Sequence, residues 1–411
     1  MQTPQQSADV TFTFDGEPCQ GRPGVPIAAA LLAAGHLSWA RSPKFHRPRG
    51  PSCFRAACDG CLARVNGVPN VMTCLEPLTA GATVESQNIV GSVRFDVLRI
   101  TDWFFPSGIN HHELFAGVPG VSDVMQNVAR RVAGLGTLPE HVVPAQEAQR
   151  RDVDVLIVGS GPAGMIAALK LARAGRQVTV VDDAIQAGGT ARAFGASGPF
   201  DATLESFVAA VQAHQIELHL RAVVGAVYGD DVLVVLQSGA QVLRAKTLVL
   251  AAGAHDAVLP FEGNDLPMVQ SARAAGLLLA HGALKASRLV VCALEEPSPL
   301  AASVVARARA LGMDVTVVHE PPQAAKGTSR VKKVVLADGA EVAADALIID
   351  APRAPSYELL VQVGATLQHE PRGFVPVLTG CQVREGVYAI GEMAGVPLDY
   401  GAITAQCDAL T

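Results

Sequence analysis

The stretch Val153-Asp-Val-Leu-Ile-Val-Gly159-Ser-Gly161-Pro-Ala-Gly164 decides the fold of this chain. An apolar strand runs into three glycines and then into a helix that we expect over Met165–Ala174, with a second strand at Val178–Val181. This is the opening of a doubly wound α/β domain that binds a dinucleotide. The first glycine permits the tight turn, the second lets a pyrophosphate approach, and the third lets the helix pack on the strand.

The residues around this turn predict how the dinucleotide is held. Pro162 and Ala163 open the helix, whose N-terminus offers amide donors and a favourable dipole to the phosphates. Asp182 follows the second strand, where an acid binds the ribose hydroxyls and disfavours a 2′-phosphate. The predicted binding residues are therefore Gly159, Gly161, Pro162, Ala163, Gly164 and Asp182; the alternative is a glycine-rich turn without a ligand.

Three later features resemble FAD-binding flavoproteins. Gly188-Gly189 follows the acidic position at the spacing seen in them, and the stretch that ends in Ala252-Gly253 resembles their strand that returns to the cofactor. Gly391-Glu392 resembles the motif near the C-terminus whose acid, usually Asp, meets the ribityl chain. The resemblance predicts FAD, with these six residues in its site.

A second strand–helix–strand pattern lacks the glycine turn. Leu289–Leu294, Ala301–Ala310 and Val315–Val318 have the apolar spacing, but no glycine lies between the first strand and the helix. Glu295 and Glu296 would meet phosphates with like charge, which is costly. We predict a degenerate NAD-like domain, retained for packing or docking, that binds NAD(P)H poorly.

Four of the eight cysteines lie close together in the N-terminal part. Cys53, Cys58, Cys61 and Cys74 have the spacing C-x4-C-x2-C followed by a more distant fourth cysteine, which is typical of a plant-type [2Fe–2S] site. A structural zinc site more often shows two C-x2-C pairs. We predict a [2Fe–2S] cluster, with zinc and unliganded thiols as the alternatives. Arg47 and Arg49, just before the cysteines, lie either on a solvated basic loop or against an anionic cluster or phosphate.

Composition bounds the rest. The chain has 411 residues, a hydrophobic content of 49% and a net charge of -6, which favour a globular protein of two to three domains and argue against nucleic-acid binding. It has no apolar run long enough for a membrane span and no signal-peptide pattern, so we expect a cytoplasmic protein.

The predicted architecture is α/β: a two-dinucleotide-binding-domain flavoprotein, doubly wound, preceded by a small α+β ferredoxin-like domain of the β-grasp type. In that reading the NAD-like domain is inserted in the FAD domain. The predicted ranges are 1–105 for the [2Fe–2S] domain, 106–150 for a linker with a helix, 151–262 for the first part of the FAD domain, 263–350 for the NAD-like domain and 351–411 for the second part of the FAD domain.

The combination resembles the α subunits of heteromeric amine and imino-acid dehydrogenases. The segments that carry the likeness are the stretch from Arg41 to Gly50, the cysteine run, Gly67-Val-Pro-Asn-Val71, Pro77-Leu78 and Phe104-Phe-Pro106. That group includes sarcosine oxidase, opine oxidase, hydroxyproline and proline dehydrogenases, and hydrogen cyanide synthase. The resemblance implies a D-amino-acid-oxidase-like flavoprotein β subunit as partner. It also allows a further small subunit and an FMN between subunits.

Three functions compete on these residues. The leading hypothesis is an FAD and [2Fe–2S] electron-transfer subunit of an amine or amino-acid dehydrogenase, because flavin accepts two electrons and a cluster passes them on singly. The second is a self-sufficient reductase that uses NAD(P)H. The third is a degenerate scaffold. The sequence identifies no catalytic residue for the substrate reaction.

Overall fold

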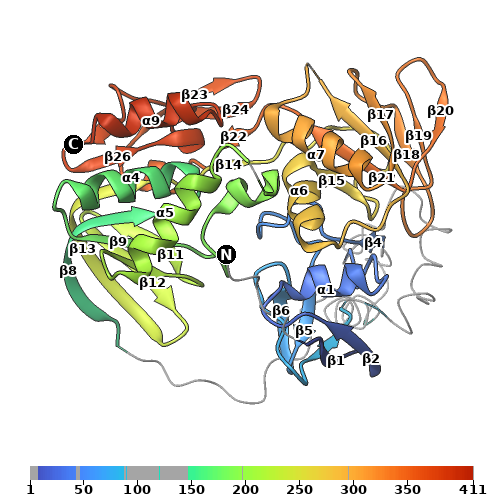
Figure 1. Cartoon of the computed structure of the whole chain (residues 1–411), viewed down its shortest axis with the longest axis horizontal. Helices are drawn as coiled ribbons and strands as arrows, with labels where there is room; N and C mark the ends of the chain where they lie inside the picture. Colours follow the sequence, from blue (N-terminus) through green and yellow to red (C-terminus); the bar gives the residue numbers. More distant parts are fainter. Residues whose placement is uncertain are drawn as a thin grey trace.

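The elements fall into three groups, shown in blue, in green with red, and in orange in Figure 1. The computed structural model describes residues 8–42, 47–87, 89, 120, 147–196, 198–294 and 296–410. The predicted linker helix within 106–150, the segment Phe104–Pro106 and Glu295 lie outside the described residues. Among the described helices, none is long and apolar enough to cross a membrane.

The N-terminal group, here called the cluster domain, is a five-stranded sheet covered by one helix. The strand order β2-β1-β7-β5-β6 places the parallel pair β1–β7 in the middle, flanked by antiparallel neighbours. The helix α1 buries its apolar face from Ile27 to Leu32. The elements are β1 (Val10–Phe14), β2 (Glu17–Gly21), α1 (Ile27–Ala33), β3 (Ala40–Arg41), β4 (Pro48–Arg49), β5 (Leu62–Val65), β6 (Val68–Met72) and β7 (Thr83–Glu85).

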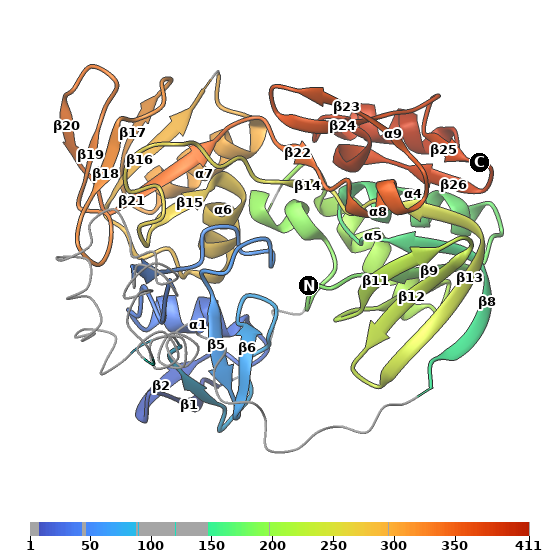
Figure 2. The ribbon, with the colours of Figure 1, turned by 180° about the vertical axis from the view of Figure 1, so that it is seen from behind.

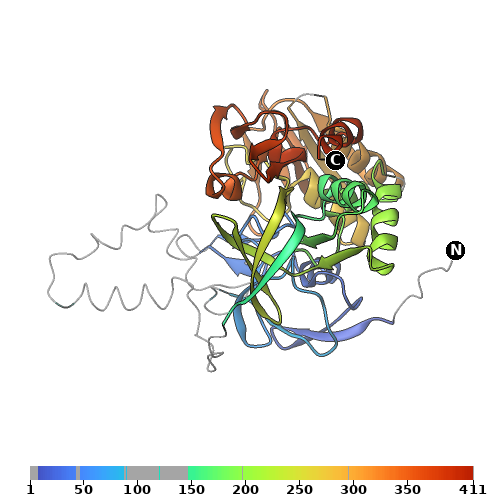
Figure 3. The same cartoon turned by 90° about the vertical axis from the view of Figure 1, so that its left-hand side faces the viewer.

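The second group, here called the flavin domain, is built on the parallel strands β10, β9, β8, β13 and β26. The long strands β8 and β13 run side by side through it (Figure 3). Helices α4, α5 and α9 contribute to the core on one face. The elements are β8 (Gln149–Val158), α4 (Pro162–Arg173), β9 (Val178–Val181), η2 (Gly189–Phe194), α5 (Asp201–Gln212), β10 (Ile216–His219), β11 (Val223–Tyr228), β12 (Asp231–Leu236), β13 (Gly239–Leu250), α8 (Glu358–Gln362), β23 (Thr366–Glu370), β24 (Gly373–Val377), β25 (Gln382–Arg384), β26 (Val387–Ala389), η3 (Gly391–Ala394) and α9 (Tyr400–Asp408).

The third group, here called the NAD-like domain, is a four-stranded parallel sheet in the order β15-β21-β16-β17. The chain leaves the flavin domain through β14 (Ala254–His255) and returns through β22 (Ala354–Pro355), and these two short strands pair with each other. The domain is therefore an insertion in the flavin domain. Its elements are β15 (Val269–Ser271), α6 (Ala272–His281), β16 (Arg288–Ala293), α7 (Pro299–Ala310), β17 (Asp314–Val318), β18 (Ala324–Lys326), β19 (Lys333–Val335), β20 (Glu341–Ala343) and β21 (Ala346–Asp350).

The cluster domain is docked on the NAD-like domain, below it in Figures 1 and 2. The backbone N–H of Ser271 donates to the carbonyl of Ser52 at 3.0 Å, and one connected apolar core runs from Phe12 and Trp39 to Leu278 and Val291. The NAD-like domain thus serves as a docking surface within the chain.

The two arginines of the basic segment contribute to this docking. Arg49 lies 3.1 Å and Arg47 lies 3.7 Å from the carboxylate of Asp265, on the NAD-like side. Both guanidinium groups therefore face a protein carboxylate, a position that neither of the two readings of the sequence included.

The elements that the sequence predicts lie close to observed ones, but the structure also contains elements that were not predicted. The apolar pattern predicts two strands at Gln241–Ala245 and Thr247–Ala251, whereas the structure has the single strand β13, because β13 pairs with β8 from Gln241 to Leu250. Helices α5, α6 and α8 were not predicted from the sequence, nor were strands β6, β15, β18 to β21 and β23 to β25.

Candidate functional site: a cavity between the glycine turn and the cysteine loop

All three domains line one cavity. The flavin domain contributes Gly161 and Asp182, the cluster domain contributes Arg55 and Cys74, and the NAD-like domain contributes Arg273. Nine of the twelve predicted cofactor residues lie on its wall: Gly159, Gly161, Pro162, Ala163, Asp182, Gly189, Ala252, Gly253 and Glu392.

The glycine turn has the geometry that a bound pyrophosphate needs. Gly159 has φ +104°, and a Cβ there would come within 2.5 Å of the carbonyl oxygen of Ala251. A Cβ on Gly164 would lie 1.9 Å from the Gly159 oxygen, so Gly164 serves the packing of helix on strand. A Cβ on Gly161 would meet no protein atom within 4 Å, and Gly161 is the N-cap of α4 without a side-chain hydrogen bond to the helix. The first-turn amides of α4 are thus left to donate hydrogen bonds to an anion.

Asp182 lies on the cavity wall, and its carboxylate also closes the glycine turn. One oxygen accepts from the backbone N–H of Ser160 at 2.5 Å and from its hydroxyl at 2.7 Å, while the other accepts from the N–H of Ala184. The next residue, Asp183, opens onto the same cavity. The enclosure by the walls and the charge of Asp182 raise the pKa of Asp183 to about 6, and Arg55 opposes the shift.

Of the remaining predicted residues, Gly188 and Gly391 pack against the glycine turn, and Glu392 lines the cavity. Gly188 has φ +114° and donates its N–H to the Ser160 carbonyl at 2.9 Å, which holds the second glycine pair against the first turn. Gly391, with φ +66°, packs against Ala163, where a Cβ would lie 2.5 Å away. Glu392 is paired with Arg353 at 2.8 Å, and the Arg353 side chain is only 17% exposed. The side chain of Glu392, which is longer than the Asp usual in this motif, is therefore held by Arg353.

The four cysteines of the run form two pairs. The Sγ atoms of Cys53 and Cys58 are 3.3 Å apart, and those of Cys61 and Cys74 are 3.4 Å apart. Two thiolates on one tetrahedral metal with bonds of about 2.3 Å would be about 3.8 Å apart, so each pair fits one iron of a two-iron cluster. Within each pair, one thiol donates to the other, which raises the pKa of Cys53 and Cys74 and lowers that of Cys58 and Cys61.

The cysteine loop adopts its bend without glycine. Phe54 has φ +56° and Ala56 has φ +59°, a left-handed conformation that costs an ordinary residue about 1–2 kcal/mol. As a result, the N–H groups of Arg55 and Ala57 both donate to Cys53 Sγ, at 3.4 and 3.3 Å. Donors fixed around a sulfur are a recognised means of tuning a cluster.

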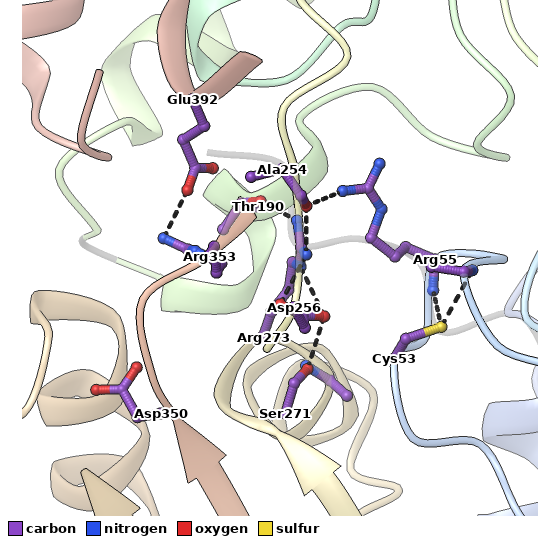
Figure 4. Close-up of polar contacts among 12 residues, drawn as sticks. Cys53, Arg55, Thr190, Ala254, Asp256, Ser271, Arg273, Asp350, Arg353 and Glu392 are labelled. Atoms are coloured by element: carbon purple, nitrogen blue, oxygen red, sulfur yellow. Dashed lines mark hydrogen bonds and ion pairs between the residues drawn. The ribbon is translucent and has the colours of Figure 1, made fainter. Parts of the chain in front are cut away.

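Three arginines of the site were not predicted (Figure 4). Arg273 pairs with Asp256 at 2.7 Å and donates to the carbonyl of Ala254 at 2.8 Å. Arg55 donates to the same carbonyl and to that of Ala252 at 3.2 Å, and Arg353 holds Glu392. These residues come from three separate segments, and no spacing in the sequence links them.

In a second dinucleotide-binding domain, the pyrophosphate would lie at the start of α7. Here a protein carboxylate accepts hydrogen bonds at that place. Asp350 accepts from the backbone N–H of Ser298 at 2.8 Å and from its hydroxyl at 2.9 Å. The Ser298 hydroxyl in turn accepts from the N–H of Ala301 as the N-cap of α7. The N–H groups of Ser298 and Ala301 at this helix start are thus already hydrogen-bonded within the protein.

Family models match two parts of the chain. Residues 7–89 match the 2Fe-2S iron-sulfur cluster binding domain, and residues 153–293 match the pyridine nucleotide-disulphide oxidoreductase family. Together with the glycine turn and the paired thiols, these matches confirm the predicted FAD and [2Fe–2S] cofactors.

Curated relatives include α subunits of sarcosine oxidase. The one from Rhizobium meliloti (strain 1021) is 35% identical over 193 residues, which cover 45% of this chain and 20% of that protein. The one from Corynebacterium sp. (strain U-96) is 27% identical over 88% of this chain and 35% of that protein. Hydrogen cyanide synthase subunit HcnB of Pseudomonas protegens is 32% identical over 40% of this chain and 38% of that protein. The chain spans about a fifth to two fifths of the length of these relatives.

Among solved structures, L-proline dehydrogenase from P. horikoshii matches 99% of this chain and 74% of its own, with a TM-score of 0.73 and 22% identity. This likeness concerns the fold. The relatives and the two matched domains confirm the resemblance inferred from the sequence, to the α-subunit group of heteromeric amine and imino-acid dehydrogenases with a fused [2Fe–2S] domain.

Proposed function

We propose that this chain is the FAD and [2Fe–2S] electron-transfer subunit of a heteromeric flavin-dependent amine or imino-acid dehydrogenase. It receives electrons that a partner flavoprotein subunit removes from the carbon–nitrogen bond of the substrate, and it passes them to an external acceptor. The observation that carries this proposal is the shared cavity, which is lined by Arg55 of the cysteine loop, by Cys74 after strand β6 and by Gly161 of the glycine turn.

The residues of the chain would hold both cofactors side by side. The free N-terminus of α4 would bind the FAD pyrophosphate, and Asp182 and Glu392 would lie along the cofactor. The two thiol pairs would each hold one iron. Bound flavin supplies a centre that takes two electrons and gives them up singly.

The relatives support a partner. Their names designate subunits, sarcosine oxidase subunit alpha and hydrogen cyanide synthase subunit HcnB. The partner that we propose is a D-amino-acid-oxidase-like flavoprotein, which would carry the substrate site. The competing role of an NAD(P)H reductase is disfavoured by the carboxylate of Asp350 at the start of α7.

A stopped-flow experiment tests the proposal. The purified chain should contain FAD, iron and acid-labile sulfide, and it should not be bleached by imino acids under anaerobic conditions. Addition of a D-amino-acid-oxidase-like flavoprotein as the candidate β subunit, together with the imino acid, should bring rapid bleaching of this chain's flavin or cluster. A complex that turns over substrate while this chain stays oxidised would refute the electron-transfer role.

A further inference from the structure

Arg55 contacts both redox sites at once. Its backbone N–H donates to Cys53 Sγ at 3.4 Å, and its guanidinium lines the cavity between the carbonyls of Ala252 and Ala254 (Figure 4). Those carbonyls belong to the segment between β13 and β14, which includes the predicted FAD residues Ala252 and Gly253. A single residue therefore connects the cysteine loop to the flavin side.

The loop is shaped to place this residue. The left-handed conformations of Phe54 and Ala56 lie on either side of Arg55, where most proteins would use glycine. The bend turns the Arg55 amide toward Cys53 while its side chain extends the other way, as Figure 4 shows. Strain of this kind is kept where the surrounding contacts enforce it; here Phe54 is buried in the core and Arg55 is held by the carbonyls of Ala252 and Ala254.

Among the residues that the structure describes, no carboxylate forms an ion pair with Arg55. The neighbouring Arg273 is already paired with Asp256, and both arginines donate to the carbonyl of Ala254. A cation in this position favours any added negative charge on either side.

We propose that Arg55 is the positioning residue for electron exchange between the cluster and the flavin, an inference that rests on the proposed function. Its side chain fixes the cysteine loop against the flavin segment, and with both cofactors bound its charge would stabilise the reduced state of each. The exchange would be a one-electron step, in which the oxidised cluster would gain the electron that the reduced flavin loses. Arg55 makes and breaks no covalent bond.

Variants of the full chain with both cofactors bound test this role. Arg55→Gln removes the charge, and Arg55→Lys keeps the charge but loses the two-pronged contact with the carbonyls. The matched control is Arg307→Gln, because Arg307 is also half-buried and donates to two carbonyls, those of Ala193 and Gly276, but does not line the cavity. FAD, iron and sulfide contents are measured first for every variant.

The main readout is the reduction potential of each centre, by EPR-monitored titration for the cluster and by absorbance for the flavin. Arg55→Gln should lower the cluster potential by the equivalent of about a tenfold change in its one-electron reduction equilibrium, which is about 59 mV. Arg55→Lys should leave the potentials near those of the wild type but slow the exchange measured after rapid photoreduction of the flavin. The control should change neither.

The outcomes separate the two proposals. If the wild-type chain exchanges electrons and both Arg55 variants behave like the control, the role of Arg55 is refuted and the proposed function stands. If the wild-type chain holds both cofactors but exchanges no electrons, the proposed function fails, and the potentials of Arg55→Gln still decide whether its charge acts on the centres. If Arg55→Gln does not fold, unchanged exchange in Arg55→Lys relative to an Arg307→Lys control refutes the role.

Discussion

At the scale of single residues, Gly161 offers a direct test of the flavin cavity. The space beyond its Cα is open, so a larger side chain would meet the cofactor and not the protein. Gly161→Val should lower FAD affinity by about tenfold to a hundredfold, since an inserted side chain costs about 1–3 kcal/mol. Extracted flavin per chain gives the measurement, with Gly225→Val as control because a Cβ there makes only ordinary contact with Leu233. Full FAD occupancy in Gly161→Val would show that this turn holds no pyrophosphate.

A second prediction at this scale concerns acid stability and His281, which lines the far part of the cavity. Burial and the charges of Arg22 and Arg192 lower its pKa to about 4 from the usual 6.5. The unfolded chain therefore takes up a proton below about pH 6.5 that the folded chain takes up only near pH 4, so the folded state loses stability as the pH falls through this window.

His281→Gln should remove this loss. Between about pH 7 and pH 4.5, its free energy of unfolding should fall by about 1–2 kcal/mol less than that of the wild type, a figure reduced from the full shift because the side chain is partly exposed. Urea unfolding at the two pH values measures it. His369→Gln, at an exposed site on β23, is the control. Equal acid sensitivity of wild type and His281→Gln would contradict the prediction.

At the scale of elements, the start of α7 governs the response to nicotinamides. Because Asp350 already occupies the Ser298 donors, NADH and NADPH should bleach the flavin of the lone chain slowly, whereas dithionite should bleach it fully. Anaerobic stopped-flow absorbance distinguishes the cases. Bleaching by NADH at about 10 s⁻¹, a typical enzyme turnover, would favour a self-sufficient reductase.

Elements with strong local signals could be predicted from the sequence, and contacts between distant segments could not. Strand β9 has the predicted bounds and β17 begins one residue earlier than predicted, because apolar runs are a local property of the sequence. The glycines of the first turn were recognisable because their conformations depend on the absence of a side chain.

Other features have no local signature. The three arginines at the cavity depend on how the domains dock, and the shared carbonyl of Ala254 shows this most clearly. Strand β13 is continuous because it pairs with β8, and that pairing is not visible in the sequence of β13 itself. Asp350 at the start of α7 comes from the end of β21, far from Ser298 in the sequence.

At the scale of the whole molecule, the cluster domain bridges the other two. Arg221 of the flavin domain pairs with Glu76 at 2.5 Å, and Arg22 donates to the carbonyl of His281 in the NAD-like domain at 2.7 Å. Together with the connected core, these contacts should make the chain unfold in one transition.

Differential scanning calorimetry checks this expectation. The wild type should give one peak, and the double variant Arg22→Ala/Arg221→Ala should broaden or split it. Arg288→Ala is the control, because its ion pair with Asp345 is exposed and lies within the NAD-like domain. Separate peaks in the wild type would contradict the prediction.

The short paired strands β14 and β22 are the two places where the chain crosses between the flavin and NAD-like domains, and in many proteins such a pair works as a hinge. Here the cluster domain contacts the domains on both sides of this pair: Glu76 pairs with the flavin domain, and Ser52 accepts a hydrogen bond from the NAD-like domain. The cluster domain therefore restricts bending at this point. Because hinge motion is restricted, the distance between the redox centres should not vary with movement of one domain relative to another. The rate of exchange between them should then be indifferent to solvent viscosity, unlike that of carriers whose cluster domain travels between donor and acceptor.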